Sequence, residues 1–537
     1  MYSRISGLTL VFVLVGSMLL VLLAEGCSTT APSDTSQTAA ISTKAYGSLV
    51  IGGSFGTGQV NPQFGSSADY RGLGFAIFDT LAYTNDKDEL LGGIAERWEI
   101  APDGKTQTFY IRKGVKFHNG DDLTGADVKF SFERMLKPET TQTSIEQWRA
   151  LIASVSLKDD YTVLVQLKTA SYDLLPNLSY LGVVMPKKYI EEKGDDFFNK
   201  NPMGSGPWKF LSYVPGTRLE LEAVESHWRT TPQFRTLTLL GVKEEGTRLA
   251  MLKTGELDAA AIKVDWVPDL QKAGLQIKKS GHGARFFAWP WYDLENPGSS
   301  PFGDVNVRKA LALGINSKEI ADTIYKGYGG PYALLPMVAS SYFNDPIQVK
   351  PDAYDPEGAK KLLAAAGFPN GFDTKIWDIG GEQSLVAQAE SGYFRKIGVN
   401  AQITAMDFAT LRTKYRPKLL PEVMNTIFNY SSPTVNYTSD VFSFATWFHS
   451  KIGSSMNINN PALDQLIEKV PLTADPAQKK QIAIQAAVMA KNGYTSIPVV
   501  EAFSLMASGP KIGEAKRVET EQEGLMAITY ENLTHAK

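Results

Sequence analysis

The sequence predicts a mixed α/β fold, because strand patterns and helix patterns are interleaved along its 537 residues. Apolar and charged residues alternate over 218–223, and apolar and polar residues alternate over 162–167, as in half-buried strands. The run TQTFYIRKGVKF at 106–117 predicts a hairpin of two strands around Lys113-Gly114. Interleaving over this length argues against an all-strand barrel and against a helical array.

Capping residues mark helix boundaries in the C-terminal half of the chain. Asp355 followed by Pro356 predicts the first turn of a helix, and Gly367 supplies the left-handed turn that ends it. The same reasoning predicts three more helices, which begin at Asp304, Asn460-Pro461 and Asp475-Pro476. These helices alternate with strand-like segments, which supports the mixed fold class.

Charge and cysteine content exclude several classes of protein. The 54 basic and 57 acidic residues give a net charge of −3. This charge creates no positive electrostatic potential that would attract nucleic acid, so we expect no nucleic-acid partner. Cys27 is the one cysteine, so no disulfide can form within the chain. The length suggests about three domain-sized units and allows a large buried core.

The N-terminus predicts an exported protein. Arg4 precedes a nearly unbroken apolar run from Leu8 to Leu23, which is the pattern of a secretory signal peptide over residues 1–26. Cys27 follows directly and resembles the lipobox cysteine of bacterial lipoproteins. That resemblance implies a diacylglycerol on Cys27, which would then be the new N-terminus and the membrane anchor.

Two features bear on this anchor. Ala24 and Glu25 stand where the lipobox usually has Leu and a small residue, so an uncleaved anchor and a cut elsewhere remain alternatives. Residues 27–45 are rich in Ser, Thr and Ala and cannot bury enough apolar surface to order themselves. They predict a lipid-anchored, flexible tether with a reach of roughly 20–25 Å.

No metal site and no cofactor are predicted. The chain has five histidines, and none has a ligand-like partner three or four residues away; they are His118, His227, His282, His449 and His535. His118 lies in a turn, where a lone histidine is usually a hydrogen-bonded structural group. We therefore expect a structural rather than a catalytic role for His118.

Several segments together resemble the bacterial extracellular solute-binding proteins of family 5, which are the peptide, dipeptide, nickel and opine receptors of ABC importers. The most specific segment is GVKFHNGDDLTGADVKFSFER, from Gly114 to Arg134. The other segments are, in chain order, VNP at 60–62, IAERWE at 94–99, PDGK at 102–105, MGSGPW at 203–208, LKTGELD at 252–258, PFGDVNVRKAL at 301–311, LDQL at 463–466 and IP at 497–498. Each is weak alone, but their order and spacing are specific.

The resemblance implies a periplasmic binding protein-like α/β fold of the class II, three-domain type. Such a fold has two lobes, a hinge and an additional subdomain in the first lobe. We expect lobe I at 46–285 with the inserted subdomain at about 81–180, lobe II at 286–495, and a C-terminal return to lobe I at 496–537. The two chain crossings are then expected near 286–296 and 495–503.

The resemblance also implies a binding function in which no covalent bond of the ligand changes. A small organic solute, oligopeptide-like, opine or sugar-like, is captured by hinge closure and delivered to the permease subunits of an ABC importer. The implied protein is not an enzyme, is a monomer, and lies in the cell envelope, where its lipid anchor holds it to a membrane facing the periplasm or exterior.

Aromatic residues supply the first candidate ligand contacts. The run FFAWPWY at 286–292 lies at a predicted crossing, and we expect Trp289 or Trp291 to face the cleft. Aromatic walls suit a wide pocket that holds varied organic ligands. The alternative is that these rings pack in the core. Phe55 is also expected to contact ligand, and Phe408 resembles the family's other pocket aromatic.

The segment 426–433 departs from the peptide-binding members of the family. In those proteins an aromatic residue is followed about three places later by an Asp that holds the ammonium group of the ligand. Here no carboxylate falls in the segment, and Asn429, Tyr430 and Ser431 offer neutral hydrogen bonds instead. Because an unpaired buried ammonium is costly, the sequence favours a sugar, opine-like or acylated ligand over a free-amine peptide. The alternative is an ordinary strand-to-loop segment.

Two other functions stay open. GGSFG at 52–56 matches G-x-S-x-G with Ser54 as nucleophile, as in a secreted serine hydrolase. A nucleophile elbow needs a helix directly afterwards, and the following residues 57–62 are loop-like. The second alternative is a sensory or chaperone-like receptor of the same fold that serves no importer.

Overall fold

The structure is a computed structural model of the chain. It describes residues 46–53, 60–63, 76–84, 90–141, 145–335, 343, 345, 347–407, 410, 426–432, 440–451, 459–515, 519–520, 526–527 and 530–536. The predicted signal peptide, Cys27 and the tether lie outside the described residues. Within these residues helices and strands are interleaved, which confirms the predicted mixed α/β class.

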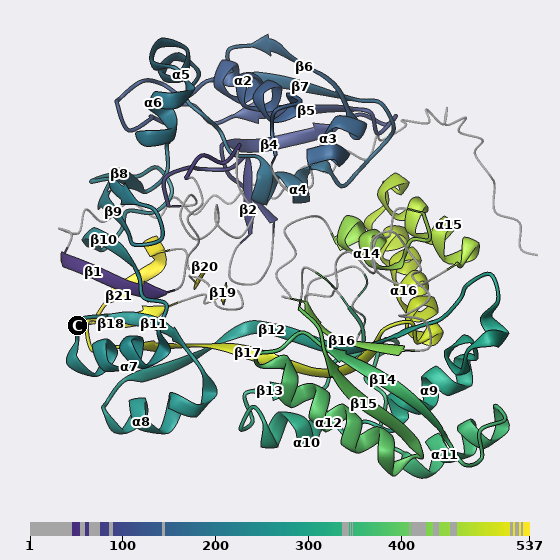
Figure 1. The fold of residues 1–537 in the computed structure, drawn as a ribbon. Coiled ribbons are helices and arrows are strands. Elements are labelled where there is room, and N and C mark those ends of the chain that lie inside the picture. Colours follow the sequence, from purple (N-terminus) through teal and green to yellow (C-terminus); the bar gives the residue numbers. More distant parts are fainter. Residues whose placement is uncertain are drawn as a thin grey trace, which may run out of the picture.

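One mixed sheet of eleven strands runs through both lobes and organises the fold (Figure 1). Its strand order is β15-β14-β16-β12-β17-β11-β1-β10-β9-β8, and β13 pairs with β17 off this path. The strands are β1 (Tyr46–Gly53), β8 (Trp208–Val214), β9 (Arg218–Ala223), β10 (Phe234–Gly241), β11 (Ala259–Ile262), β12 (Gln276–Trp291), β13 (Gly329–Gly330), β14 (Phe372–Asp378), β15 (Val399–Ala405), β16 (Thr426–Ser432) and β17 (Ile497–Ser508).

Lobe I is built on the end of this sheet that carries β1 and β8 to β11. β1 pairs in parallel with β10 and with β11, and β10 and β9 pair antiparallel, so the predicted strand over 218–223 is confirmed. Leu49, Leu219 and Leu239 from these strands are fully buried in one core. Helices α7 (Glu245–Thr254) and α8 (Val267–Lys272), with the 3-10 turn η1 (Val264–Trp266), lie beside β11 and β12.

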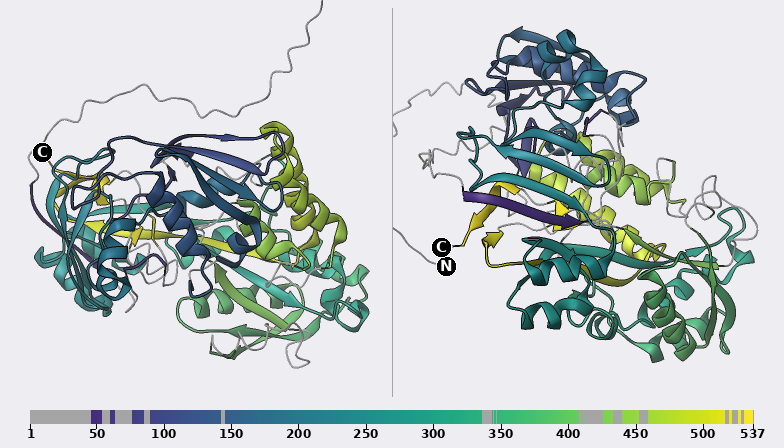
Figure 2. Two further views of the ribbon diagram at one scale, coloured as in Figure 1. Left: turned by 90° about the horizontal axis from the view of Figure 1, so that it is seen from above. Right: turned by 60° about the vertical axis from the view of Figure 1, so that its left-hand side comes forward.

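The inserted subdomain stands above lobe I in Figures 1 and 2. It holds a four-stranded antiparallel sheet of order β4-β5-β7-β6 and a small hairpin, β2–β3. Its elements are β2 (Ala82–Thr84), β3 (Leu90–Gly92), β4 (Ala95–Ile100), β5 (Thr106–Ile111), α2 (Gly125–Leu136), α3 (Ile145–Leu151), β6 (Ile152–Asp159), β7 (Thr162–Leu167) and α4 (Leu174–Leu181). The next helices, α5 (Lys187–Lys193) and α6 (Asp195–Lys200), bury Ile190 and Phe198 in the lobe I core. Strand β7 confirms the prediction over 162–167.

The hairpin predicted over 106–117 is wrong in its second half. β5 forms as expected, but it pairs with β4 and β7, which are its neighbours in the sheet. After Gly114, which has φ 79°, the chain leaves the sheet and makes a single bridge between Lys116 and Asp122. Val115 and Phe117 are buried in the subdomain core. Their alternation therefore reflects packing in this core and not a second strand of a hairpin.

Lobe II places helices on both faces of its part of the sheet. Its helical elements are η2 (Pro297–Ser299), η3 (Pro301–Gly303), α9 (Val305–Leu313), α10 (Ser317–Thr323), α11 (Pro356–Ala365), α12 (Gln383–Lys396), α14 (Asp440–Phe448), α15 (Pro461–Lys469), η5 (Val470–Leu472) and α16 (Pro476–Gly493). Side chains of β12 alternate between two cores: Phe286 and Ala288 pack in one, Trp289 and Trp291 in the other. In Figure 1 the group α14 to α16 stands on the side of the sheet that faces the subdomain.

The four helices predicted from capping residues are confirmed. In α11 the side chain of Asp355 accepts a hydrogen bond from the backbone N–H of Gly358 at 2.8 Å, and Gly367 has φ 92° just beyond the helix end. Asp304, Asn460 and Asp475 cap α9, α15 and α16 in the same way. Local capping chemistry therefore determined these boundaries.

After β17 the chain ends against lobe I. The described terminal elements are β18 (Ile512–Ala515), β19 (Glu519–Thr520), β20 (Met526–Ala527), η6 (Tyr530–Asn532) and β21 (Leu533–His535). Met506, Ile512 and Leu533 are buried in the lobe I core together with β1 and β10. The first and last described segments thus share one hydrophobic core.

The two lobes are joined by the antiparallel pair β12–β17. The pairing is regular from Gln276 to Lys279, breaks, and resumes at Gly283 opposite Phe503. At the break the backbone N–H of Ser504 donates to Oγ of Ser280 at 3.0 Å. Core membership changes at the same place: Ala502 packs in lobe II, whereas Met506 packs in lobe I.

Gly283 is the position at which this junction is least tolerant of a side chain. A Cβ atom there would lie 1.9 Å from the carbonyl oxygen of Ala502, whereas a Cβ at Gly330, on the neighbouring β13, would meet nothing within 4 Å. Gly283→Ala should therefore lower the free energy of unfolding by about 1–3 kcal/mol or more, through overpacking. Gly330→Ala is the matched control, and equal denaturation midpoints for the two variants would contradict this reasoning.

Candidate functional site

An aromatic cluster lies between the lobe II sheet and helices α14 to α16. Phe287, Trp289 and Trp291 alternate along β12, and both indoles are only 2% exposed. The rings of Trp289 and Trp291 are 4.8 Å apart, and Phe287 makes an edge contact with Trp447 of α14 at 5.7 Å. The structure thus places the predicted aromatic residues together and buries them, and their contact with a ligand stays a prediction.

Strand β16 brings the other predicted segment beside this cluster. β16 pairs antiparallel with β12, with Tyr430 opposite Phe287, Asn429 opposite Ala288 and Ser431 opposite Phe286. Five of the predicted contacts, on segments about 140 residues apart, therefore lie on adjacent strands; they are Trp289, Trp291, Asn429, Tyr430 and Ser431. Phe55, Phe408 and Ser54 lie outside the described residues.

The carboxyl edge of the lobe II sheet adds residues that sequence reasoning missed. β14 runs parallel to both β15 and β16, so the carboxyl ends of three strands meet at one edge, where ligands of α/β proteins commonly bind. Trp377 near the end of β14 and Trp447 of α14 are only partly buried. A sequence signal did exist: Trp377 and Asp378 end a strand and a glycine pair, Gly380-Gly381, precedes a helix.

A charged pair stands where β12 and β17 enter lobe II. Nε of Arg285 lies 3.4 Å from Oε1 of Glu501, and Nη1 of Arg285 donates to the carbonyl oxygen of Leu334 at 3.2 Å. The guanidinium also lies 5.2 Å from the ring centre of Tyr332. Tyr332 donates its hydroxyl to the carbonyl oxygen of Phe286 at 2.9 Å, and burial raises the pKa of that phenol well above its usual value.

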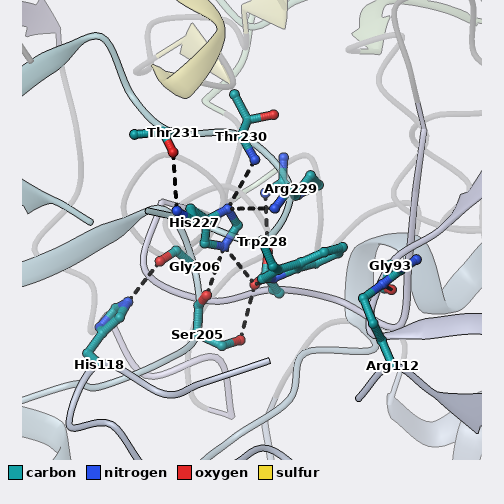
Figure 3. Close-up of polar contacts among 11 residues, drawn as sticks. Gly93, Arg112, His118, Ser205, Gly206, His227, Trp228, Arg229, Thr230 and Thr231 are labelled. Atoms are coloured by element: carbon teal, nitrogen blue, oxygen red, sulfur yellow. Dashed lines mark hydrogen bonds and ion pairs between the residues drawn. The ribbon is translucent and has the colours of Figure 1, made fainter. Parts of the chain in front are cut away.

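A second polar cluster is centred on Asp79 and includes Ser205, His227, Trp228 and Arg229, which Figure 3 labels. Asp79 is 3% exposed and accepts hydrogen bonds from Trp228 Nε1 at 2.8 Å, from Ser205 Oγ at 3.2 Å and from His227 Nε2 at 3.2 Å. Arg229 adds an ion pair at 3.2 Å. Burial alone would raise the pKa of Asp79, but the hydrogen bond from His227 and the charge of Arg229 outweigh it and lower the pKa to about 2.

This cluster contains serine, histidine and aspartate, yet its geometry is not that of a hydrolase. Nε2 of His227 points to Oδ2 of Asp79 and to the carbonyl oxygen of Ser205 at 2.9 Å, both of which are acceptors. Nδ1 accepts from the backbone N–H groups of Arg229 and Thr230. The hydroxyl of Ser205 donates to Asp79 instead of to a histidine nitrogen, so no base is placed to activate it.

His118 is a structural residue of the same region. Its Nε2 lies 2.9 Å from the carbonyl oxygen of Gly206, and its backbone N–H donates to Gly204 at 2.9 Å (Figure 3). These contacts tie the subdomain to the segment that precedes β8. Burial lowers the pKa of His118 to about 4, so the ring is neutral at pH 7.

The described residues contain neither a cluster of metal-ligating side chains nor a membrane-spanning helix. Nowhere in these parts of the chain do three or more His, Cys, Asp or Glu side chains come together in a way that could hold a metal ion. Within the same residues, no helix combines the length and the apolar character that crossing a bilayer requires.

The two-lobed fold, with an aromatic cluster beside the crossing strands, defines a solute-binding class of protein. Residues 89–451 match the model of the bacterial extracellular solute-binding proteins, family 5 Middle, and the chain belongs to this family. The resemblance seen in the sequence, and the fold class it implied, are therefore confirmed.

Curated relatives are named for binding and not for a reaction. The chain is 29% identical to heme-binding protein A of Haemophilus influenzae over 78% of this chain and 80% of that protein. It is 28% identical to the glutathione-binding protein GsiB of Pectobacterium atrosepticum over 74% and 77%, and 28% identical to the dipeptide-binding protein of Escherichia coli over 65% and 70%.

Solved structures show the same fold. The substrate-binding protein CtaP of Listeria monocytogenes superposes with a TM-score of 0.78 at 23% identity, covering 92% of this chain and all of that one. NikA of Brucella suis in complex with Fe(III)-EDTA gives 0.76 at 20% identity, with 91% of this chain and 100% of that chain covered. HbpA2 of Haemophilus parasuis gives 0.75 at 21% identity over 91% and 100%.

The lowered pKa of His118 predicts an acid-sensitive stability. In the unfolded chain the imidazole of His118 has its ordinary pKa of 6.5. Between this pH and about pH 4 the unfolded state therefore binds a proton that the folded state does not bind. The free energy of unfolding should therefore fall as the pH drops from 6.5 toward 4, and His118→Gln should flatten that slope. Urea unfolding at several pH values measures it, and equal slopes for parent and variant would contradict the assignment.

Proposed function

We propose that the protein is the substrate-binding component of an ABC importer and that it captures a peptide-like ligand. The observation that carries this proposal is the convergence of two predicted contact segments on adjacent strands, β12 and β16, beside the strands that join the lobes. Membership of family 5 and relatives named for binding dipeptides and glutathione support it.

The ligand is proposed to bind against the carboxyl edge of the lobe II sheet. Partly buried Trp377 and Trp447 supply apolar contact area there. The contacts predicted from the sequence complete the proposal: Phe55 and Phe408 as aromatic contacts, and Asn429, Tyr430 and Ser431 as neutral hydrogen-bonding residues. Trp289 and Trp291 form the wall behind them. Aromatic walls with a few polar groups give affinity for varied organic ligands together with a fixed orientation.

The composition of the site narrows the ligand class. Residues 426–433 contain no carboxylate, and Arg285, the buried cation of the crossing strands, is already paired with Glu501. A ligand with a free ammonium would find no opposite charge in that segment, and burying it unpaired would be costly. We therefore propose a peptide-like compound whose amino group is acylated or otherwise neutral, with opine-like and sugar-like compounds as the neighbouring classes.

Binding is proposed to act by closure of the two lobes. A ligand that touches both lobes only when they are closed stabilises that state by its difference in affinity. The break in pairing between Lys279 and Gly283 is the proposed bending point, because the ladder is interrupted there and the core changes from one lobe to the other. The permease then receives the closed, loaded form.

The protein is further proposed to be a monomeric lipoprotein of the cell envelope. Cys27 would carry the lipid, and residues 27–45 would let the body move close to the membrane that holds the permease. The apolar segment from Leu8 to Leu23 would serve as the h-region of the signal peptide. The described body begins at Tyr46, directly after this tether.

Ligand affinity should depend on Trp447. With N-acetylated dipeptides, free dipeptides, reduced glutathione and haem as test ligands, we expect the acylated peptides to bind and Trp447→Ala to raise their dissociation constant about tenfold, the equivalent of one lost aromatic contact. Titration calorimetry measures this. Trp266→Ala, which removes a partly buried tryptophan from lobe I, is the control. Equal affinities for parent and Trp447→Ala would show that Trp447 does not contact the ligand.

Membrane attachment should depend on Cys27. Cys27→Ser removes the acceptor thiol, so the protein should move from the membrane fraction to the soluble fraction of the envelope, and mass spectrometry should show the loss of the diacylglycerol. Cys27 is the single cysteine of the chain, so the substitution disturbs no disulfide. Retention of the variant in the membrane fraction would favour an uncleaved N-terminal anchor.

A further inference from the structure

A buried ion pair connects the subdomain of lobe I with lobe II. Nζ of Lys479, on α16, lies 2.5 Å from Oδ1 of Asp173, at the start of α4. The side chains are 5% and 7% exposed, and 306 residues separate them in sequence. This ion pair therefore spans two bodies that are otherwise joined through the distant strands β12 and β17.

Backbone contacts support the pair. The N–H of Tyr172 donates to the carbonyl oxygen of Pro471, in η5 of lobe II, at 2.8 Å. Nζ of Lys479 also approaches the carbonyl oxygen of Tyr172 at 3.5 Å. Two neighbouring residues of the subdomain thus meet two segments of lobe II.

Both sides of the contact are firmly held by their own bodies. Ser171, two residues before Asp173, accepts from Nε2 of Gln107 at 2.7 Å and donates its N–H to Gly104 at 2.9 Å, which fixes the loop on the subdomain sheet. Lys479 lies in the first turns of α16, whose Asp475 caps the helix. Because neither side can follow the other when the lobes separate, opening must break the pair.

The ion pair between Asp173 and Lys479 lies far from the strands about which the lobes would rotate. Figures 1 and 2 show α16 and the subdomain on one side of the molecule and the crossing strands β12 and β17 on another. A second ion pair between the lobes, Lys326 with Asp265 at 2.6 Å, is largely exposed and lies near those strands, between the start of β13 and η1. Rotation of the lobes about the crossing strands therefore moves Asp173 and Lys479 apart, because both residues are distant from those strands.

We propose that Asp173 and Lys479, with the hydrogen bond from Tyr172 to Pro471, form a latch that stabilises the closed form whatever the ligand. This proposal rests on the closure mechanism proposed above. Asp173 stands at the start of α4 and Lys479 on α16, whereas the proposed ligand site is on β14 to β16, so the latch sets the fraction of closed protein and not the choice of ligand. Since apparent affinity scales with the closed fraction, loss of the latch should weaken every ligand by the same factor.

Removing one charge should open the protein more than removing both. A single substitution leaves its partner buried without an opposite charge in the closed form, which favours opening. Lys479→Met and Asp173→Asn should each lower the ratio of closed to open protein at least tenfold. The double variant should recover part of that loss, because no uncompensated charge is left to bury.

The test measures a distance across the two bodies. In a Cys27→Ser background, which has no cysteine, spin labels at Thr169→Cys and Gln465→Cys report the separation of two exposed sites, one on each body. Pulsed EPR on protein freed of ligand, and again with an N-acetylated dipeptide added, gives the fraction at short distance. We expect that fraction to fall in both single variants, and their thermal unfolding shows that they remain folded.

Lys491→Met is the matched control. Lys491 pairs with both oxygens of Asp352 at 3.0 Å, but both residues belong to lobe II. Its loss should leave the distances unchanged. Equal short-distance fractions in the parent and in both single variants, or an equal shift in Lys491→Met, would overturn the latch. A failure of the proposed function looks different, because the latch variants would still shift while no test ligand binds parent or variant.

Discussion

The antiparallel pair β12–β17 is the constraint on which the rest of the structure depends. These strands carry the chain from lobe I to lobe II and back, and their ladder unites eleven strands in one sheet. Their ladder is interrupted between Lys279 and Gly283, and its register shifts again between Phe286 and Phe287, so fewer paired residues resist twisting over this stretch. Two rigid cores on a single bendable connection are what a closing receptor needs, and the aromatic cluster stands directly beside that connection.

Buried titratable groups of this protein hold its structural parts together. Asp79 collects four donors, His118 ties the subdomain to the segment before β8, and Arg285 pairs with Glu501 between the crossing strands. Each is buried or partly buried and paired with groups of its own chain, as polar groups in a protein interior usually are. Such groups stabilise one arrangement and leave no base beside a nucleophile, which agrees with relatives named for binding.

Local signals predicted those parts of the fold that local chemistry determines. Asp355, Asn460 and Asp475 cap helices as expected, because a capping side chain and its N–H partner lie within one turn. The segment after Gly114 was mispredicted because the alternation of apolar residues does not show which part of the structure they pack against. Whether Val115 and Phe117 join a sheet or a core depends on residues far away in sequence, which no local pattern contains.

The same distinction explains the site. The aromatic run at a predicted crossing singled out Trp289 and Trp291, and the family resemblance singled out Asn429 to Ser431, but neither predicts the register that places Tyr430 opposite Phe287. Trp377 was missed because its place at the sheet edge follows from the parallel order of β14, β15 and β16. Trp447 was missed because its contact with Phe287 joins α14 to the distant strand β12. A site built on strands that are distant in sequence exists only once those strands are paired, so its residues are chosen by topology. Under the closure proposed above, a ligand that contacts both β16 and lobe I stabilises the closed arrangement of the two lobes.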